Sequence, residues 1–197
     1  MLTVIGNLKG GTGKSTVAFN LAVWLAHGNT DVHLFDLDPQ ETLMDTAEIR
    51  EEDGYEPVIE VSNDVDELEM LVNSKGRNNT TQLVADVSAT NLPQLEKAIS
   101  LARRILIPVQ PSQADIWSTQ RFLKIVLSCM NKKNKPEILA FITRADTHPG
   151  VRETGEAEEA LQMLPNIEAL DTRLYTRTAF RRSFSEGLAV FEQYPMG

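Results

Sequence analysis

Residues 9–16 combine three glycines, two lysines and three hydroxyl side chains in one short loop. The loop consists of Lys9, Gly10, Gly11, Thr12, Gly13, Lys14, Ser15 and Thr16. Glycines let backbone N–H groups turn toward an anion where a Cβ atom would obstruct them. Lys14 can bridge the β- and γ-phosphates of a nucleotide, and the Ser15 hydroxyl can ligate Mg²⁺. The loop therefore predicts a phosphate site, and a glycine-rich turn without a ligand is the alternative.

Acidic residues end two other apolar runs. Asp36 and Asp38 have the i, i+2 spacing that points two side chains of a strand the same way. Asp86 ends the run Leu83–Asp86, and a carboxylate there can hold the hydration shell of Mg²⁺. Ligands of open parallel sheets lie at the carboxyl ends of the strands, so we expect these acids near the loop. Solvated side chains at strand ends are the alternative.

The elements that must position these residues alternate along the chain. Strands are predicted over Leu2–Asn7, Val32–Asp36, Pro57–Val61, Gln82–Val87, Arg104–Val109 and Glu137–Thr143. Helices are predicted over Thr16–His27, Glu41–Glu52, Val65–Asn73, Leu92–Leu101 and Ala114–Asn131. The alternation predicts an α/β fold with a mostly parallel, twisted sheet, helices on both faces and one domain over residues 1–197. We expect Trp24 and Trp117 to fill the core, Trp24 on a face with Val17, Leu21 and Leu25.

Composition excludes several classes of protein. The chain has 197 residues and a net charge of −9, which argues against simple binding to DNA or to an anionic membrane. The single cysteine, Cys129, excludes an internal disulfide and a cysteine metal cluster. No apolar run approaches the ~18 residues of a membrane span, and the N-terminus has no signal-peptide pattern. These features predict a cytoplasmic protein.

The loop departs from the strict phosphate-loop pattern, because Leu8 stands at the place of its first glycine. Residues 9–16 resemble the deviant Walker A box of the ParA/MinD family of ATPases. The resemblance implies a P-loop NTPase fold, ATP and Mg²⁺ as cofactors, ATP hydrolysis and a homodimer that forms with ATP. It also implies that Lys9 reaches the phosphates of the partner subunit, as an arginine finger does. An ordinary lysine at a strand end is the alternative.

Other segments resemble the same family. The run Asp36–Gln40 resembles switch I, in which Asp38 would position the attacking water and Asp36 would lie near the magnesium shell. Ser15, Asp36 and Asp86 are thus the implied metal-site residues. The runs Ile107–Ser112 and Phe141–Arg144 resemble the late strands that hold adenine, and we expect Arg144 to contact the base. The resemblance covers nearly the whole chain, and its size implies no N-terminal helix-turn-helix domain.

Basic residues cluster in the C-terminal half. Four arginines lie between residues 171 and 182, namely Arg173, Arg177, Arg181 and Arg182. Thr172–Glu192 resembles the C-terminal helix region of the family, and Arg177 and Arg181 would share one helix face. In ParA-type proteins such residues contribute to sequence-independent DNA binding by the ATP dimer, which would depend strongly on salt. Lys132, Lys133 and Lys135 form a second candidate patch, and a solvated helix face is the alternative for both.

The sequence thus favours a ParA-like ATPase that binds nucleoid DNA as an ATP-dependent dimer. An adaptor would stimulate hydrolysis, so that a plasmid, a chromosome region or a protein body such as a carboxysome is positioned. The acidic window 41–69 is the candidate adaptor surface. One alternative is a MinD-like membrane-cycling ATPase, which needs a basic amphipathic C-terminal helix, whereas residues 191–197 are short and contain Pro195. The other is a metabolic P-loop enzyme of the same fold. We expect no membrane partner.

Overall fold

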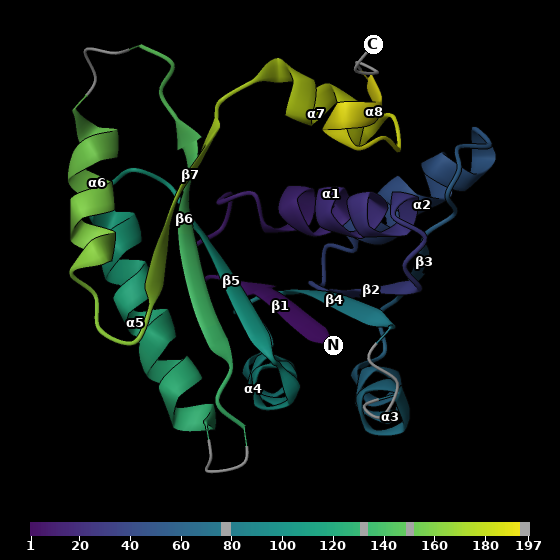
Figure 1. Ribbon diagram of the computed structural model, residues 1–197, viewed down its shortest axis with the longest axis horizontal. Coiled ribbons are helices and arrows are strands. Elements are labelled where there is room, and N and C mark those ends of the chain that lie inside the picture. The colour runs from purple at the N-terminus through teal and green to yellow at the C-terminus, as the bar shows by residue number, and fades with distance from the viewer. Residues whose placement is uncertain (76–79, 131–133, 149–151, 194–197) are drawn as a thin grey trace.

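The computed structural model describes residues 1–75, 80–130, 134–148 and 152–193. Within these residues, seven parallel strands form one sheet in the order β3-β2-β4-β1-β5-β6-β7 (Figure 1). The strands are β1 Leu2–Gly6, β2 Val32–Leu37, β3 Glu60–Ser62, β4 Gln82–Val87, β5 Arg104–Val109, β6 Glu137–Ala145 and β7 Glu168–Tyr175. The helices are α1 Lys14–His27, α2 Thr42–Glu52, α3 Val65–Lys75, α4 Leu92–Leu101, α5 Gln113–Cys129, α6 Glu153–Gln162, α7 Thr178–Ser185 and α8 Val190–Gln193.

Helices cover both faces of the sheet, as the sequence predicts. In Figure 1, α1, α2, α7 and α8 lie over one face, and α3, α4, α5 and α6 over the other. The central strands are apolar because both faces are buried, so that Ile5 belongs to the core under α1 while Val4 belongs to the opposite core. The two cores fix the orientation of every central strand.

The polar strand ends meet at one edge of this sheet. Asp36 on β2 is the register partner of Asp86 on β4, and Asp86 is in turn the partner of Ile5 on β1. The loop that follows β1 therefore lies beside both acids, as we expected from the parallel arrangement.

Several predicted elements are confirmed with the same bounds, among them Gln82–Val87, Leu92–Leu101 and Arg104–Val109. The C-terminal region is different. Helix α6 and strand β7 are not among the predicted elements, and Thr172–Tyr175 belongs to the edge strand β7 rather than to a helix. Arg177 precedes α7 in an extended conformation, so the prediction that it shares a helix face with Arg181 is wrong. An edge strand that is largely exposed lacks the apolar run by which buried strands are recognised.

The predicted core positions of the two tryptophans are also wrong. Trp24 is 62% exposed and Trp117 is 54% exposed. Helix α1 instead buries Phe19 and Val23 together with two alanines, Ala18 and Ala22. The small alanines permit close approach of the helix to the sheet, which leaves the larger side chains to partly covered positions.

The described helices include none that is both long enough and apolar enough to cross a membrane. Residues 194–197 lie outside the described residues, and they include Pro195, on which the argument against a C-terminal membrane helix rests. Lys132 and Lys133 of the second candidate DNA patch also lie outside them.

We predict that Gly6→Ala destabilises the fold by about 1–3 kcal/mol, the usual cost of overpacking a core. A Cβ atom at Gly6 would lie 2.7 Å from Cζ of Phe122 and 3.0 Å from Cγ2 of Val87. Urea unfolding measures the change. The matched control is Gly155→Ala in α6, where an added Cβ has no neighbour within 4 Å among the described residues. Equal stability of the two variants would contradict the prediction.

Candidate functional site

The phosphate loop is held in an open conformation by polar side chains from neighbouring strands. Gly11 and Gly13 have φ values of +74° and +90°, which a side chain rarely permits. Nε2 of Gln110 donates to the Gly11 carbonyl at 2.8 Å, and Oγ1 of Thr143 donates to the Thr12 carbonyl at 2.8 Å. These hydrogen bonds fix the two carbonyl oxygens, which are acceptors, and the loop N–H groups are the donors that can bind an anion.

Asn7, which is not among the predicted site residues, anchors the start of the loop. Its buried side chain donates from Nδ2 to the Pro108 carbonyl at 3.0 Å. Its Oδ1 accepts from the Lys9 backbone at 3.3 Å and from the Ser118 hydroxyl at 3.2 Å. The sequence does contain a signal for Asn7, because an amide at the end of a fully buried strand needs hydrogen-bond partners and therefore indicates a polar network.

Ser15 and Asp86 form a pair that fits a magnesium ion. The Ser15 hydroxyl donates to Oδ2 of Asp86, whereas Oδ1 of Asp86 has no hydrogen-bond partner among the described residues. No group of three or more His, Cys, Asp or Glu side chains within the described chain could hold a metal. Magnesium is often bound by one or two carboxylates together with the phosphates of a substrate. A hydroxyl and an unsatisfied carboxylate beside a phosphate loop fit that arrangement.

The charge of Asp86 is poorly stabilised without a cation. Burial raises the pKa of Asp86 to about 7, although the Ser15 hydroxyl and the Lys14 ammonium both act against the shift. The nearby carboxylates Asp36 and Asp38 raise it further. A cation at this position would reverse the balance, because it favours the ionised carboxylate.

Asp36 and Asp38 make different contacts. Oδ2 of Asp36 accepts from the N–H groups of Leu43 and Met44 at 2.8 and 3.2 Å, and Oδ1 accepts from the Asp38 N–H at 3.3 Å. Asp36 therefore holds the start of α2 and the turn before it. Burial raises the pKa of Asp36, and these backbone hydrogen bonds oppose the shift. Asp38 lies at the site itself, where it lines a cavity above the loop. A magnesium role for Asp36 stays a prediction.

Lys9 forms an ion pair within its own chain. Its Nζ contacts Oδ2 of Asp115, whose side chain is 1% exposed, while that of Lys9 is 40% exposed. The same Asp115 oxygen accepts from the Ser112 hydroxyl, and Oδ1 has no partner among the described residues. We did not identify Asp115 from the sequence, although Ser112 and Asp115 have the i, i+3 spacing of residues that start a helix.

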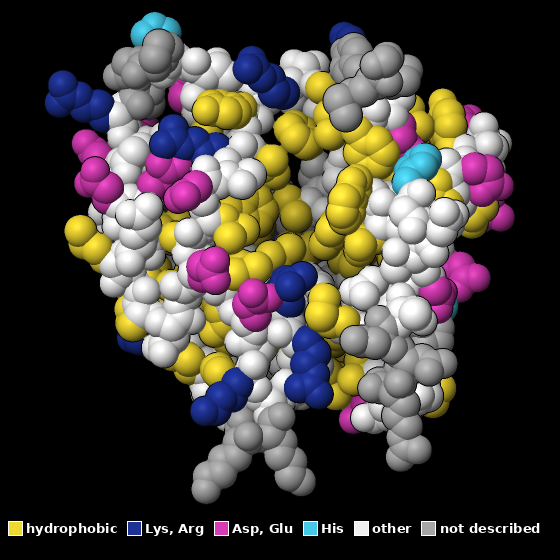
Figure 2. Space-filling view, viewed as in Figure 1, with side chains coloured by type: hydrophobic (Ala, Val, Ile, Leu, Met, Phe, Trp, Pro, Cys, Tyr) yellow, Lys and Arg dark blue, Asp and Glu magenta, His cyan; other side chains and the backbone are white. Residues whose placement is uncertain are grey.

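Two adjoining cavities surround the loop. The loop cavity, about 770 Å³, is lined by the phosphate loop, Asp38–Gln40, Ser88–Thr90, Arg144 and Phe184. The side cavity, about 310 Å³, lies among the phosphate loop, the ends of β6 and β7, and α7. Figure 2 shows that the molecule is hollowed between the part with β6 and β7 and the part with α1 and α7, with hydrophobic walls. Gly13, Thr16 and Arg144 line both cavities, so together they form one elongated site.

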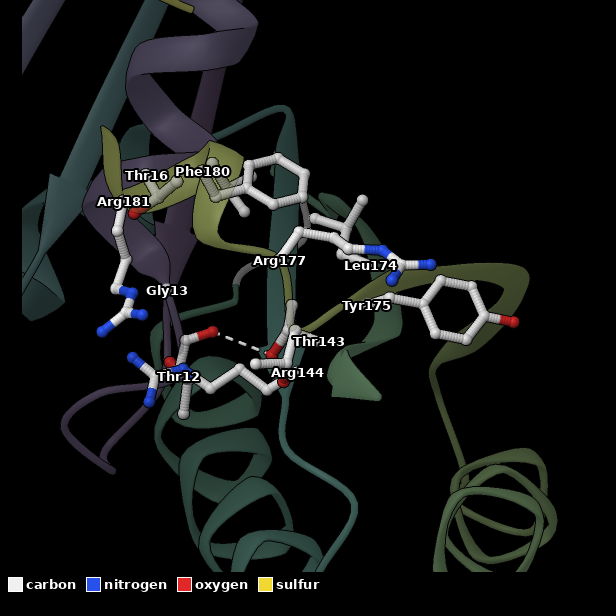
Figure 3. A pocket seen from close by; sticks show the side chains of 12 residues that line it. Thr12, Gly13, Thr16, Thr143, Arg144, Leu174, Tyr175, Arg177, Phe180 and Arg181 are labelled. Carbon is white, nitrogen blue, oxygen red and sulfur yellow. Dashed lines mark hydrogen bonds between the residues drawn. The ribbon is translucent and has the colours of Figure 1, made fainter. Parts of the chain in front are cut away.

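The side cavity combines apolar and cationic residues. Its described lining includes three arginines and no acid, with Leu174 and Phe180 among the apolar residues. In Figure 3 the side chains of Arg144 and Arg181 both extend toward the side of the pocket formed by Thr12 and Gly13. Two cationic side chains repel each other, and an anion bound near both would offset that repulsion. An apolar pocket that opens onto cations fits a nucleotide, with the base in the pocket and the phosphates at the loop.

Arg144 reaches this position through an unusual backbone conformation. Its φ is +52°, which costs a non-glycine residue about 1–3 kcal/mol and is found mainly at functional sites. The β6–β7 register shifts between Ile142 and Ala145, around the same residue. The local irregularity places Arg144 between the two cavities.

The four arginines that we proposed for DNA have separate surroundings. Arg173 pairs with Glu158, and the Arg177 guanidinium lies 5.9 Å from the centre of the Tyr175 ring. Arg177 and Arg181 line the side cavity. Arg182 is exposed on α7. Their DNA-binding role stays a prediction, for which Arg182 is the residue least involved in the candidate nucleotide site.

Comparison with known proteins decides the family. The model of the CobQ/CobB/MinD/ParA nucleotide-binding domain matches residues 3–190. The chain belongs to this family. This ParA/MinD-like ATPase is 29% identical over 195 residues to the maintenance of carboxysome distribution protein A of Halothiobacillus neapolitanus, a match that covers 95% of this chain and 85% of that protein.

Solved structures share the fold of this ParA/MinD-like chain. Apo McdA from Cyanothece has a TM-score of 0.76 at 20% identity, and the match covers 98% of this chain and 93% of that one. A plasmid partition protein from Borrelia burgdorferi, bound to AMPPNP, has a TM-score of 0.70 at 18% identity, with 98% and 94% covered. These similarities confirm the predicted α/β P-loop fold.

We predict that Asp86→Asn stabilises the nucleotide-free protein at pH 8 by roughly 2–4 kcal/mol. The folded-state pKa is raised from 3.8 to about 7, so the stability of the native protein falls as pH rises across that window. The amide removes this penalty, so the advantage should fall to less than half near pH 5 and disappear only below the unfolded-state pKa of 3.8. Thermal unfolding at both pH values measures it.

The same variant should lose the strengthening of ATP binding by Mg²⁺, measured by titration with Mg²⁺ or with EDTA. Asp171→Asn, at an exposed position on β7, is the control and should match the parent protein in both assays. A variant that keeps the magnesium effect would contradict the assignment of Asp86.

Proposed function

We propose that the protein is an ATP-hydrolysing positioning ATPase that forms an ATP-dependent dimer and binds DNA without sequence preference. The observation that carries the proposal is the elongated site, in which a phosphate loop joins an apolar, arginine-lined cavity on one side and Asp38 on the other. Membership of the ParA/MinD family supports the same activity.

The residues of the site can be given distinct tasks. The loop N–H groups and Lys14 bind the phosphates, and Phe180 and Leu174 cover the base. Ser15 and Asp86 would hold Mg²⁺, which supplies charge neutralisation at the phosphates when bound. Asp38 orients the attacking water, while the backbone hydrogen bonds of Asp36 fix the turn in which Asp38 lies.

Dimer formation requires an exchange of partners at Lys9. In the single chain, Lys9 neutralises the buried Asp115. A lysine that reaches the phosphates of a second subunit must leave this carboxylate, which is then buried without its counter-ion. The intramolecular ion pair therefore opposes dimerisation until the triphosphate of the partner offers Lys9 a stronger attraction.

The cargo is proposed from the relatives. The names of similar proteins refer to carboxysome distribution and to plasmid partition, and a carboxysome or a plasmid is therefore the proposed cargo. The exposed acids of α2, which include Asp45, Glu48 and Glu51, form a surface suited to a basic adaptor segment. The proposed site of action is the cytoplasm, on nucleoid DNA.

We predict that Asp115→Asn lowers the protein concentration needed for the ATP-bound dimer by about tenfold, equivalent to ~1.4 kcal/mol. The amide weakens the attraction that holds Lys9 in its own chain and leaves no buried charge behind. Analytical ultracentrifugation with a non-hydrolysable ATP analogue measures the dimer. Asp64→Asn, at an exposed position before α3, is the control. A dimer that forms at the same concentration in both variants would contradict the partner exchange.

DNA binding is tested by retention on duplex DNA of random sequence without nucleotide, with ADP and with ATP, across a salt series. We expect retention with ATP alone. Arg182→Ala should reduce the slope of log affinity against log salt by about 2, because each subunit of the dimer loses one phosphate contact. Arg104→Gln, which replaces a residue paired with Glu137, should leave the slope unchanged. Absence of retention with ATP would refute the DNA-binding part of the proposal.

A further inference from the structure

A buried arginine links α2 to the C-terminal helices. Arg50 is 0% exposed, and its guanidinium donates four hydrogen bonds. Two run to the carboxylate of Glu192 at 2.8 and 2.9 Å, one to the Gly187 carbonyl at 2.9 Å and one to the Pro57 carbonyl at 2.8 Å. A guanidinium without such partners would be costly to bury. We call Arg50 and Glu192 the clasp.

Glu192 is equally well bonded. It accepts from the Ala189 N–H at 2.7 Å and contacts Nε2 of His27 at 2.8 Å. Burial acts to raise the pKa of Glu192, but the hydrogen bonds from Arg50 and His27 outweigh it and hold the pKa below its usual value. The clasp is therefore an ionised pair that joins α2 to α8, and His27 links it to α1.

The backbone after α7 lies directly against α2. Gly187 has a φ of +69°, and a Cβ atom there would lie 2.6 Å from the backbone nitrogen of Arg50. No side chain fits between the two segments. The clasp and this close approach together fix the point where α7 ends.

Helix α7 has little anchorage of its own. Within its eight residues only Ser183 is buried, and Phe184 makes an edge-to-face contact with Phe19 of α1 at 5.7 Å. Yet α7 supplies Phe180 and Arg181 to the side cavity and Phe184 to the loop cavity. In Figure 1, α7 and α8 lie beside each other over α1 and α2. The position of this wall must therefore depend on contacts beyond α7 itself.

We propose that Arg50 is a positioning residue for nucleotide recognition. Through Glu192 and Gly187 it fixes α7 as the wall of the side cavity, and so contributes more to the affinity for ligands that carry a base than to the affinity for the phosphate chain alone. This inference rests on the proposed function, in which the two cavities hold ATP.

The test compares two ligands, a non-hydrolysable ATP analogue and inorganic tripolyphosphate, both with Mg²⁺ and measured by calorimetric titration. The variants are Glu192→Gln and Arg50→Lys, which keep side-chain size and retain some hydrogen bonds. We expect both to bind the analogue about tenfold more weakly, a change of ~1.4 kcal/mol, and to show a clearly smaller loss of affinity for tripolyphosphate. Lys97→Gln breaks an exposed ion pair between α3 and α4 and should change neither affinity.

Hydrogen exchange supplies a second measurement that needs no ligand. In Glu192→Gln, amides of Thr178–Ser185 should exchange faster, while those of Leu92–Leu101 keep their protection. Unchanged exchange in α7, or equal weakening of both ligands, would overturn the inference. A parent protein that binds tripolyphosphate but not the analogue would refute the proposed base site, and with it the ligand-discrimination role of the clasp.

Discussion

The parallel arrangement of the strands brings the carboxyl ends of β1, β2, β4, β5 and β6 to one edge, and the chemistry of the molecule depends on this constraint. Asp36 and Asp86 are register partners on adjacent strands, and the loop after β1 lies beside them. Gln110 and Thr143 follow or end the next strands and hold the carbonyls of that loop. The pairing of the strands thus brings residues that are more than 130 positions apart in the chain, such as Thr12 and Thr143, to the same edge of the sheet.

Three buried charges of this molecule differ in how well they are satisfied. The guanidinium of Arg50 has four protein hydrogen bonds and acts as a fastening between elements. Asp115 has a cation as its partner, but that cation is Lys9, whose side chain is partly exposed. Within the described chain, the side chain of Asp86 has the Ser15 hydroxyl as its one hydrogen-bond partner, and its Oδ1 has none. The less a buried charge is satisfied within the fold, the more its environment points to a partner from outside.

Much of this arrangement could be predicted from the sequence. The loop residues, the central strands and the strand-end acids follow from local patterns, because glycine spacing and apolar runs are properties of neighbouring residues. The edge strand β7 and the exposed positions of Trp24 and Trp117 could not be predicted in this way, since they depend on which side of each element the sheet occupies.

The same reason explains the missed polar contacts. Asp115 lies 106 positions from Lys9, and Arg50 lies 142 positions from Glu192. Neither pair has a local signature that connects its members. Arg177 and Arg181 were grouped with Arg173 and Arg182 by their spacing, whereas the fold places the first two around a cavity. Charge counts along a chain do not tell which charges face solvent and which face a ligand.

The hydrogen bonds to the Gly11 and Thr12 carbonyls affect both the binding and the release of a nucleotide. A loop that is already ordered loses little conformational entropy when it captures a ligand. That advantage applies to a diphosphate as well as to a triphosphate, because the loop is ordered before either ligand binds. In the proposed hydrolysis cycle the diphosphate product would therefore be released slowly, and its release rather than the binding of a new triphosphate would limit the rate.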